Sequence, residues 1–273
     1  MLTEPSYDSA SRRSPFLQEL IELANYRDLV GLFVSRINKT RYKRSSLGVI
    51  WTLLNPILNM AVLSLAFSQV FRSSVPHYSV YVLAGIIHWN FFSQTTSYAM
   101  NTMVWGGNLL KRVYLPRTIF AVAAIGNGLI NFGIATAALA VIVKLAGLPF
   151  YPSWWIVPFA VLLLAMFSLG VALIMSTLAV FFTDVVEMYG VALQAWFFLT
   201  PIVYPKSTLP AKFVWLMNLN PAYNLLEMFR TPIYMGLIPG PKTIAAATVS
   251  AGFSLLLGWW VFTRKAEEIA YRI

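Results

Sequence analysis

The sequence contains no cysteine and few charged residues, which make up 11% of the chain. The absence of cysteine excludes disulfides, thiol nucleophiles and cysteine metal sites. Its only histidines, His77 and His88, are too few for a histidine-based metal site. A GxxxxGK[ST] loop that would hold ATP phosphates is missing, as are the GxGxxG, HExxH and GxSxG motifs. The chain therefore has no recognisable catalytic centre and no P-loop of its own.

Apolar residues dominate the composition, at 58% of the 273 residues. Soluble domains carry about 25% charged residues, more than twice the share found here. The net charge of +10 comes from basic residues that flank apolar segments, a pattern of membrane topology and not of nucleic-acid binding. Residues 1–14 are polar, so no cleavable signal peptide is expected. The composition predicts an all-α polytopic membrane protein.

Six apolar segments are candidates for transmembrane helices, since roughly 20 residues cross the hydrocarbon core. The predicted spans cover about 47–71, 78–104, 118–143, 154–182, 188–204 and 243–263. Residues 1–25 are predicted as a polar tail and short helix, and 264–273 as a tail. Between spans five and six, prolines divide the apolar residues of 205–242 into pieces too short to cross, which predicts re-entrant external helices.

The segment 26–46 is basic and amphipathic. Leu29, Phe33 and Ile37 recur at i, i+4 and i+8, while basic residues occupy other faces. Such a helix before a span is expected to lie in the membrane surface. Packing of this helix on another protein is the alternative.

The distribution of Lys and Arg predicts the orientation. Eight precede span one, three lie in 105–117 and three follow span six, against six on the other side. The positive-inside rule therefore places both termini in the cytoplasm. No Asp, Glu, Lys or Arg falls inside the predicted spans, whereas an ion-coupled carrier usually needs one. Energy for transport is thus expected from elsewhere.

The sharpest local pattern is a polar and aromatic stripe on span one. Trp51, Asn55 and Asn59 follow each other at one-turn intervals, so they share one helix face. Asparagines in a membrane need partners or water. The stripe therefore predicts a channel wall or a seam between two subunits.

Several motifs in order resemble the ABC-2 type permeases of polysaccharide export. They are Arg27-Asp28-Leu29, Arg41-Tyr42-Lys43-Arg44-Ser45, Leu47-Gly48 with Trp51, Leu54 and Pro56, Trp89-Asn90-Phe91-Phe92, Asn108-Leu109-Leu110-Lys111, Leu115-Pro116-Arg117, Gln194, Thr200-Pro201-Ile202 with Tyr204, and Asn220-Pro221 with Arg230 and Gly236. The resemblance covers about residues 26–265. At Phe182-Thr183-Asp184-Val185 the family more often has Arg before the Asp, which puts in doubt a salt bridge there.

The resemblance implies a homodimer that binds two copies of a cytoplasmic ATPase subunit, which would hold ATP and Mg. The chain itself would bind no cofactor and would not be an enzyme. The implied substrate is an undecaprenyl-diphosphate-linked glycan, such as O-antigen, teichoic acid or capsule. The implied location is the bacterial cytoplasmic membrane, with membrane lipids and no nucleic acid as further partners.

Roles for individual residues follow from this resemblance and from glycan chemistry, since sugars stack on aromatic rings and bond to amides. The channel candidates are Trp51, Asn55, Asn59, Trp89, Phe91, Phe92, Gln194, Phe197, Phe198 and Tyr204. The cytoplasmic entrance would be formed by Arg41, Tyr42, Lys43 and Arg44. The ATPase contacts would be Leu109, Lys111, Arg112, Arg117, Asp184 and Glu187. The external gate would contain Trp215, Asn220, Pro221, Glu227 and Arg230, of which Glu227 and Arg230 are spaced to pair.

The sequence leaves alternatives open for the roles of the aromatic residues and for the function. A lone aromatic is equally compatible with lipid contact or an interfacial belt. Within the same family, the chain could be an efflux permease for a small amphiphile or drug. From another class, it could be a membrane enzyme acting on lipid-linked sugars, against which the missing intramembrane acids argue.

Overall fold

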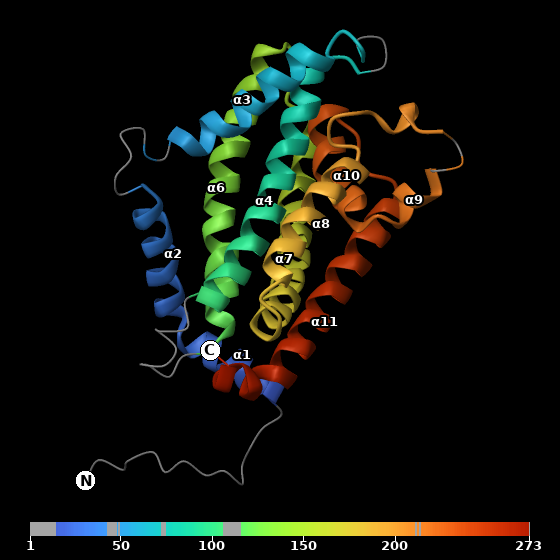
Figure 1. Cartoon of the computed structure of the whole chain (residues 1–273). Helices are drawn as coiled ribbons and strands as arrows, with labels where there is room; N and C mark the ends of the chain where they lie inside the picture. The colour runs from blue at the N-terminus through green and yellow to red at the C-terminus, as the bar shows by residue number, and fades with distance from the viewer. Residues whose placement is uncertain are drawn as a thin grey trace, which may run out of the picture.

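A computed structural model describes residues 15–42, 48, 50–71, 75–105, 116–210, 212 and 214–272, and these contain helices and no strands (Figure 1). Four helices form the body of the bundle. They are α4 (Tyr78–Trp105), α6 (Thr118–Leu145), α7 (Val157–Phe181, preceded by the short η2, Pro152–Ile156) and α11 (Pro241–Arg272). The first three follow the predicted spans closely. The last continues through the residues predicted as a separate tail.

The closest helix contact joins α7 and α11. A Cβ on Gly170 would lie 2.1 Å from the Ser254 carbonyl oxygen, and one on Gly258 would lie 2.2 Å from the Gly170 carbonyl oxygen. Glycines permit this approach, as in membrane helix pairs whose association depends on packing. Ser254 also donates a 3.0 Å hydrogen bond from its hydroxyl to the Phe167 carbonyl. The helix α7 of this pair also packs against α4.

The helix α2 (Arg27–Tyr42) runs alongside α6 (Figure 1). The ring of Phe33 meets that of Phe120 edge-on at 5.4 Å. Leu29 and Val30 pack on the same cluster. The apolar face that the sequence predicts to lie in the membrane surface is thus partly occupied by α6 of the same chain, and the surface placement itself stays a prediction.

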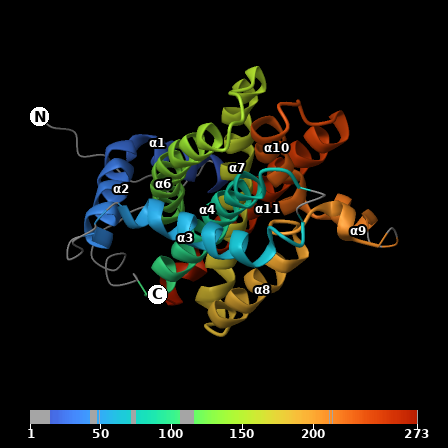
Figure 2. The ribbon, with the colours of Figure 1, turned by 90° about the horizontal axis from the view of Figure 1, so that it is seen from above.

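The helix α3 (Ile50–Phe67) is shorter than the predicted span 47–71 and lies obliquely across the upper parts of α6 and α4 (Figures 1 and 2). Most of its apolar side chains are exposed, including Val62 and Leu65. Pro56 lies inside it and is buried. Trp51 and Asn55 of the stripe are themselves exposed.

The helix α8 (Val185–Leu199) begins three residues before the predicted span 188–204 and ends five residues before its end. It ends because Thr200 precedes Pro201, and the residue before a proline is driven to extended backbone. Thr200 accordingly has φ −103° and ψ 130°. Glu187, expected in a loop, lies instead in the first helical turn, where an acid is favoured by the helix dipole.

The region 205–242 contains the short helices η3 (Lys206–Thr208) and α9 (Val214–Leu219), followed by α10 (Pro221–Tyr234). The helix α10 packs on α4, α7 and α11 near the upper end of the bundle (Figure 1). Its side chains from Ala222 to Leu226 are buried. This element is thus an integral part of the bundle, and its predicted re-entrance into a membrane stays a prediction.

The two ends of the described chain meet at the lower end of the bundle. The helix α1 (Pro15–Asn25) contacts α11 (Figure 1). Glu19 accepts hydrogen bonds from the backbone nitrogen (3.2 Å) and the hydroxyl (2.9 Å) of Thr118, at the start of α6. Arg117 donates to the Ala266 carbonyl of α11. Both ends of the described chain therefore lie at the same end of the bundle.

Four helical segments are long and apolar enough to cross a membrane: Ile50–Phe67, Thr118–Leu145, Pro152–Phe181 and Pro241–Ala266. The helix α4 is long enough, but polar side chains in its second half lower its hydropathy. The helix α8 is apolar but has only 15 residues. The chain is thus a multi-pass helical membrane protein, and the full count of six crossings remains a prediction.

Candidate functional site

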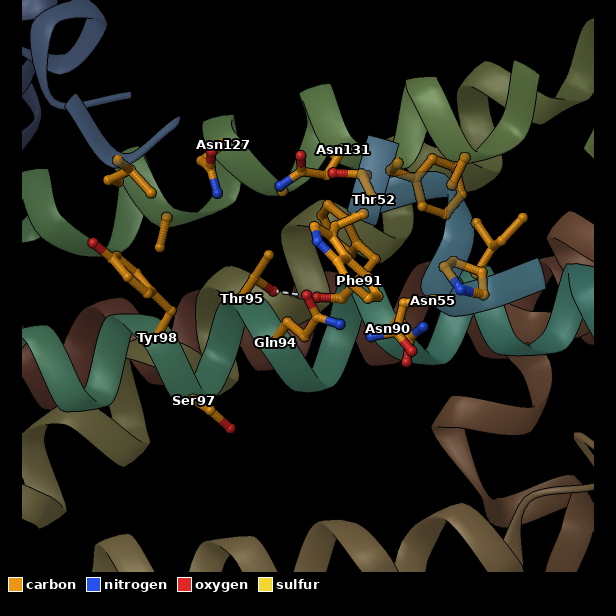
Figure 3. Close-up of a pocket in the computed structure, with 18 of the residues that line it drawn as sticks. Thr52, Asn55, Asn90, Phe91, Gln94, Thr95, Ser97, Tyr98, Asn127 and Asn131 are labelled. Atoms are coloured by element: carbon orange, nitrogen blue, oxygen red, sulfur yellow. Dashed lines mark hydrogen bonds between the residues drawn. The ribbon is translucent and has the colours of Figure 1, made fainter. Parts of the chain in front are cut away.

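A cavity of about 570 Å³ lies between α2, α3, α4 and α6 (Figure 3). Among the residues that the structure describes, none of those that line it is Asp, Glu, Lys, Arg or His. The lining residues are Ile37, Thr40, Trp51, Thr52, Asn55, Pro56, Ile87, Asn90, Phe91, Gln94, Thr95, Ser97, Tyr98, Ala124, Asn127, Gly128, Asn131, Phe132 and Ala135. Its volume falls within the roughly 300–1,000 Å³ of small-ligand pockets.

Five amide side chains from three helices define the polar character of this cavity. Asn90 and Gln94 lie one turn apart on α4, Asn127 and Asn131 lie one turn apart on α6, and Asn55 comes from α3. An amide offers two hydrogen-bond donors and an acceptor oxygen with two lone pairs. The cavity can therefore bond to a ligand rich in hydroxyl groups from several sides without using a charge.

Aromatic side chains supply the apolar surfaces of the cavity. Phe91 of α4 and Phe132 of α6 meet edge-on at 5.5 Å and close one side. Trp51, which is 48% exposed, and Tyr98 contribute further aromatic surface. Rings of this kind present flat apolar faces beside polar groups.

The close approach of α4 and α6 at Gly128 positions the two amide rows. A Cβ on Gly128 would lie 2.2 Å from Cγ2 of Thr95, so a larger residue there would push the helices apart. Thr95 in turn donates a 2.6 Å hydrogen bond to the Phe91 carbonyl (Figure 3). The threonine hydroxyl is thus used within α4.

Two of the three residues in the predicted span-one stripe line this cavity, namely Trp51 and Asn55. Asn59 does not. Its amide nitrogen donates to the Asn55 side-chain oxygen at 2.8 Å and to the Asn55 carbonyl at 2.9 Å. Asn59 therefore orients Asn55. Whether the stripe lines a glycan channel stays a prediction.

The other aromatic channel candidates mostly lie in a buried cluster. Trp89 and Phe92 are buried and contact Trp196 of α8, while Trp89 also meets Phe197 at 5.8 Å. Of the candidates on α4, Phe91 alone lines the cavity. This cluster joins α4 to α8 within one subunit.

The remaining channel candidates, on and after α8, are more exposed than Trp89 and Phe92. Gln194 and Phe198 lie on the exposed face of α8. Tyr204 donates a 2.7 Å hydrogen bond to the Phe198 carbonyl and stabilises the turn after the helix. These residues do not contact the cavity, so the predicted channel set is divided between two places in the subunit.

The predicted gate residues lie on α9 and α10 and at the residue before α10. Asn220 caps α10 by accepting from the Ala222 backbone nitrogen at 3.0 Å, and it also accepts from the Trp196 indole at 2.9 Å. Pro221 occupies the first helical position, where its missing N–H costs nothing. Trp215 on α9 is exposed. Asn220 therefore connects α10 to the end of α8.

The predicted pairing of Glu227 and Arg230 is confirmed, with 2.5 Å between their charged groups. Arg230 is 4% exposed and also donates to the Pro201 carbonyl at 2.9 Å. Burial by itself would lower the pKa of Arg230, but the Glu227 carboxylate raises it, and the net shift is upward. Arg230 therefore stays charged in a buried position.

The predicted ATPase-contact residues within the described chain lie at the lower end. Asp184 and Glu187 are exposed, and Arg117 is tied to α11. Leu109, Lys111 and Arg112 lie outside the described residues. Among the predicted entrance residues, Arg41 and Tyr42 end α2, with side chains outside the description, and Lys43 and Arg44 also lie outside it.

The cavity residues that the sequence-based site prediction missed are Asn90, Gln94, Asn127 and Asn131. The sequence pattern that could have predicted them is the one used for the span-one stripe, namely amides one turn apart in an otherwise apolar helix. The polar residues in the second half of α4 stand out in the sequence. Asn127 and Asn131 on α6 do not, because they lie among glycines and alanines. Within the described part of the chain, no group of His, Asp and Glu could hold a metal ion.

These features define a class: a multi-pass helical membrane protein with an uncharged polar cavity and no described catalytic or metal cluster. The ABC-2 type transporter family model matches residues 29–234, and the chain belongs to this family.

Relatives within that family share most of the chain. The O-antigen export system permease protein RfbA of Myxococcus xanthus is 30% identical over 92% of this chain and 98% of its own length. The protein of the same name from Klebsiella pneumoniae is 26% identical over 74% of this chain and 79% of its own length. The polysialic acid transport protein KpsM of Escherichia coli is 22% identical over 87% of this chain and 93% of its own length.

Proposed function

We propose that this protein is the membrane subunit of an ATP-driven exporter that moves a lipid-linked polysaccharide across the bacterial cytoplasmic membrane. The observation that carries the proposal is the cavity whose described lining consists of five amides, several aromatic rings and other uncharged side chains. Polysaccharides are hydroxyl-rich, and a wall of amides and rings can hold and release them without the tight binding that fixed charges would give. The names of the relatives support the same substrate class.

The energy for export would come from a separate ATPase subunit with its own ATP and Mg. Exposed acids at the lower end, Asp184 and Glu187, provide a surface for such a partner beside the start of α8. The lower end would face the cytoplasm, because both ends of the described chain lie there and the positive-inside rule places both termini in the cytoplasm. The substrate would be anchored on undecaprenyl diphosphate, with O-antigen or teichoic acid as examples of the glycan.

Two copies would form the translocation unit. The outer face of α8 supports this, because Met188 (68% exposed), Val191 (70%) and Phe198 (63%) have no cover from the rest of the described chain. Gly190 adds a small residue on that face, where a Cβ would meet nothing within 4 Å. A second α8 could pack there, with Gln194 offering a hydrogen bond between subunits.

The experiment is reconstitution in lipid vesicles. The chain is co-purified with candidate ATPase subunits encoded in the same genome, and movement of an undecaprenyl-diphosphate-linked glycan is measured with and without ATP. ATP-dependent movement supports the proposal. A chain that is stable alone, binds none of these ATPases and moves no glycan contradicts it.

A further inference from the structure

Exposed apolar side chains occur at the upper end of the bundle, on the two segments that lead into α7 and α11 (Figure 1). One segment joins α6 to α7 and carries Phe150 and Trp155. The other joins α10 to α11 and carries Met235, Leu237 and Ile238. Each of these five side chains is more than half exposed, and we call the group the upper apolar rim. An exposed apolar group of this kind indicates an interaction surface.

The two segments of the rim lie side by side. A Cβ on Gly236 would lie 2.4 Å from Cδ1 of the Tyr151 ring, and the Ser153 hydroxyl donates a 2.9 Å hydrogen bond to the Pro232 carbonyl. Gly236 has φ +71°, a conformation that glycine adopts at no steric cost, so the chain can turn there directly against the ring. The rim is therefore one surface with a fixed shape.

The rim continues the apolar surface of the membrane-spanning helices. Leu145 at the end of α6 and Leu162 on α7 are exposed, and both helices are long and apolar enough to cross a membrane. Residues 145–162 contain no charged side chain, and residues 231–262 contain only Lys242. No acidic residue of these segments therefore separates the rim from the surface that faces lipid.

The charged residues of α11 indicate the level of the rim in the bilayer. Lys242 lies in the first turn of α11, and the next charged residue is Arg264. The helix between them spans about 33 Å, close to the ~30 Å thickness of the hydrocarbon core. The guanidinium of Arg264 lies 4.4 Å from the centre of the Trp260 ring, a pair of residue types common at membrane interfaces. Lys242 thus marks the upper edge of the core, just after Leu237 and Ile238.

The backbone of the rim restricts its depth. Residues 235–240 are not helical, and lipid-exposed irregular backbone does not occur in the hydrocarbon core, because its polar groups would have no partner. The headgroup region still supplies water to such groups. Tryptophan is enriched at this level, and long lysine side chains such as those of Lys144 and Lys242 can extend toward the phosphates. The composition and the backbone of the rim therefore both fit the headgroup region.

A second copy of the chain is the main alternative occupant of this surface. The contact between copies proposed above uses the exposed face of α8. In the view from above, the upper, yellow-green end of α6 and the helix α8 lie on opposite sides of the bundle (Figure 2). A copy packed on α8 would therefore leave the rim uncovered.

We propose that the upper apolar rim is a membrane anchor that lies in the headgroup region of the leaflet at the upper end of the bundle. Its apolar side chains contact the adjoining part of the lipid chains. The anchor holds the segment that follows α10 at the bilayer surface. The inference rests on the membrane-spanning fold and does not depend on the nature of the transported substrate.

The test is electron paramagnetic resonance of the full chain in vesicles of phosphatidylethanolamine and phosphatidylglycerol. The chain has no cysteine of its own, so a single introduced cysteine carries the only nitroxide label. Leu237→Cys and Phe150→Cys place the label on the rim. Val249→Cys, at an exposed position of α11, is the lipid reference, and Ser207→Cys, at an exposed polar position of η3, is the water reference. Collisions with oxygen report lipid, and collisions with a nickel chelate report water.

Both rim labels should collide with oxygen in preference to the nickel chelate, as the Val249 label does and the Ser207 label does not. Because Val249 lies seven residues beyond Lys242 on α11, the Leu237 label should be roughly 10 Å shallower than the Val249 label. Rim labels that collide mainly with the nickel chelate would place the rim in water. Rim labels that collide little with either reagent would show that a second copy covers it. Either result overturns the proposal.

A second measurement needs no label and covers the case in which a cysteine variant fails to fold. Lipids brominated near the headgroup quench nearby tryptophans in the otherwise unmodified chain. Trp155→Phe should reduce the quenched part of the emission, whereas Trp89→Phe, which replaces a buried tryptophan, should not. An equal quenched emission in the unmodified chain and in Trp155→Phe overturns the proposal.

Discussion

The guanidinium of Arg230 on α10 lies 3.9 Å from the centre of the Tyr81 ring on α4. The same guanidinium pairs with Glu227 and bonds to the Pro201 carbonyl, and the Tyr81 hydroxyl donates to the Tyr204 carbonyl at 3.1 Å. A single buried cation thus holds α10, α4 and the turn after α8 together.

Removal of this cation should destabilise the protein strongly. Arg230→Met leaves Glu227 without its counter-charge, and breaking a buried pair in this way costs about 3–5 kcal/mol. The double variant Glu227→Met with Arg230→Met should recover much of the loss, since no charge is then left unpaired. Thermal unfolding of the detergent-solubilised protein measures both. Equal loss in the single and double variants would contradict a charge-based role.

The contact between α7 and α11 should tolerate no side chain at its centre. Gly170→Ala places a methyl group against the backbone of Ser254, which cannot move aside without separating the helices. Overpacking of this kind costs about 1–3 kcal/mol. Gly133→Ala on α6 is the control, because a Cβ there meets nothing within 4 Å, and it should leave Tm unchanged or higher. Equal Tm for the two variants would show that the two helices are not held this closely.

Trp51 and Asn55 are expected to be needed for transport and not for assembly. Trp51→Ala and Asn55→Ala should each lower ATP-driven glycan movement about tenfold or more, the effect of losing one well-placed contact. Co-purification of the ATPase should not change, since both residues belong to α3, which lies across the upper part of the bundle (Figure 1). Leu65→Ala, at an exposed position of the same helix, is the control and should transport normally. Normal transport by both cavity variants would remove α3 from the glycan path.

Reversal of charge at the start of α8 should weaken ATPase binding. Glu187→Lys changes an exposed residue in the first turn, so its effect on stability should stay near 1 kcal/mol or below. The yield of co-purified ATPase should fall several-fold if this turn contacts the partner. Lys242→Glu, an exposed charge at the opposite end of the bundle, is the matched control and should leave the yield unchanged. An unchanged yield for Glu187→Lys excludes this turn from the contact.

Long apolar runs made the bundle helices predictable from sequence. The ends of α4 and α6 agree with prediction to within two residues, because Tyr78 and Thr118 each follow a polar or proline-containing stretch. The end of α8 was predicted too late because the apolar residues after Thr200 continue past the proline that ends the helix. Hydropathy does not detect that break, whereas the backbone restriction before Pro201 does.

The sequence predicted only some of the residues that line the cavity, because it does not show how the helices are placed relative to one another. Helix periodicity places Trp51 and Asn55 on one face, but it does not show which helix that face meets. The partner amides Asn127 and Asn131 come from α6, and the oblique course of α3 brings the two sets together (Figure 3). Trp89 and Phe92 were assigned to the channel by residue type, and their burial against Trp196 comes from the position of α8, which no pattern in α4 encodes.

The contact between α1 and α11 has a consequence for biosynthesis. During translation α1 is made long before Ala266 and the buried Ile269 of its neighbour α11. The lower end of the bundle is therefore incomplete until α11 is made, and α1 remains without this neighbour while the helices between them are inserted. Nascent chains stalled before Ala266 should expose α1 to added protease, and full-length chains should protect it.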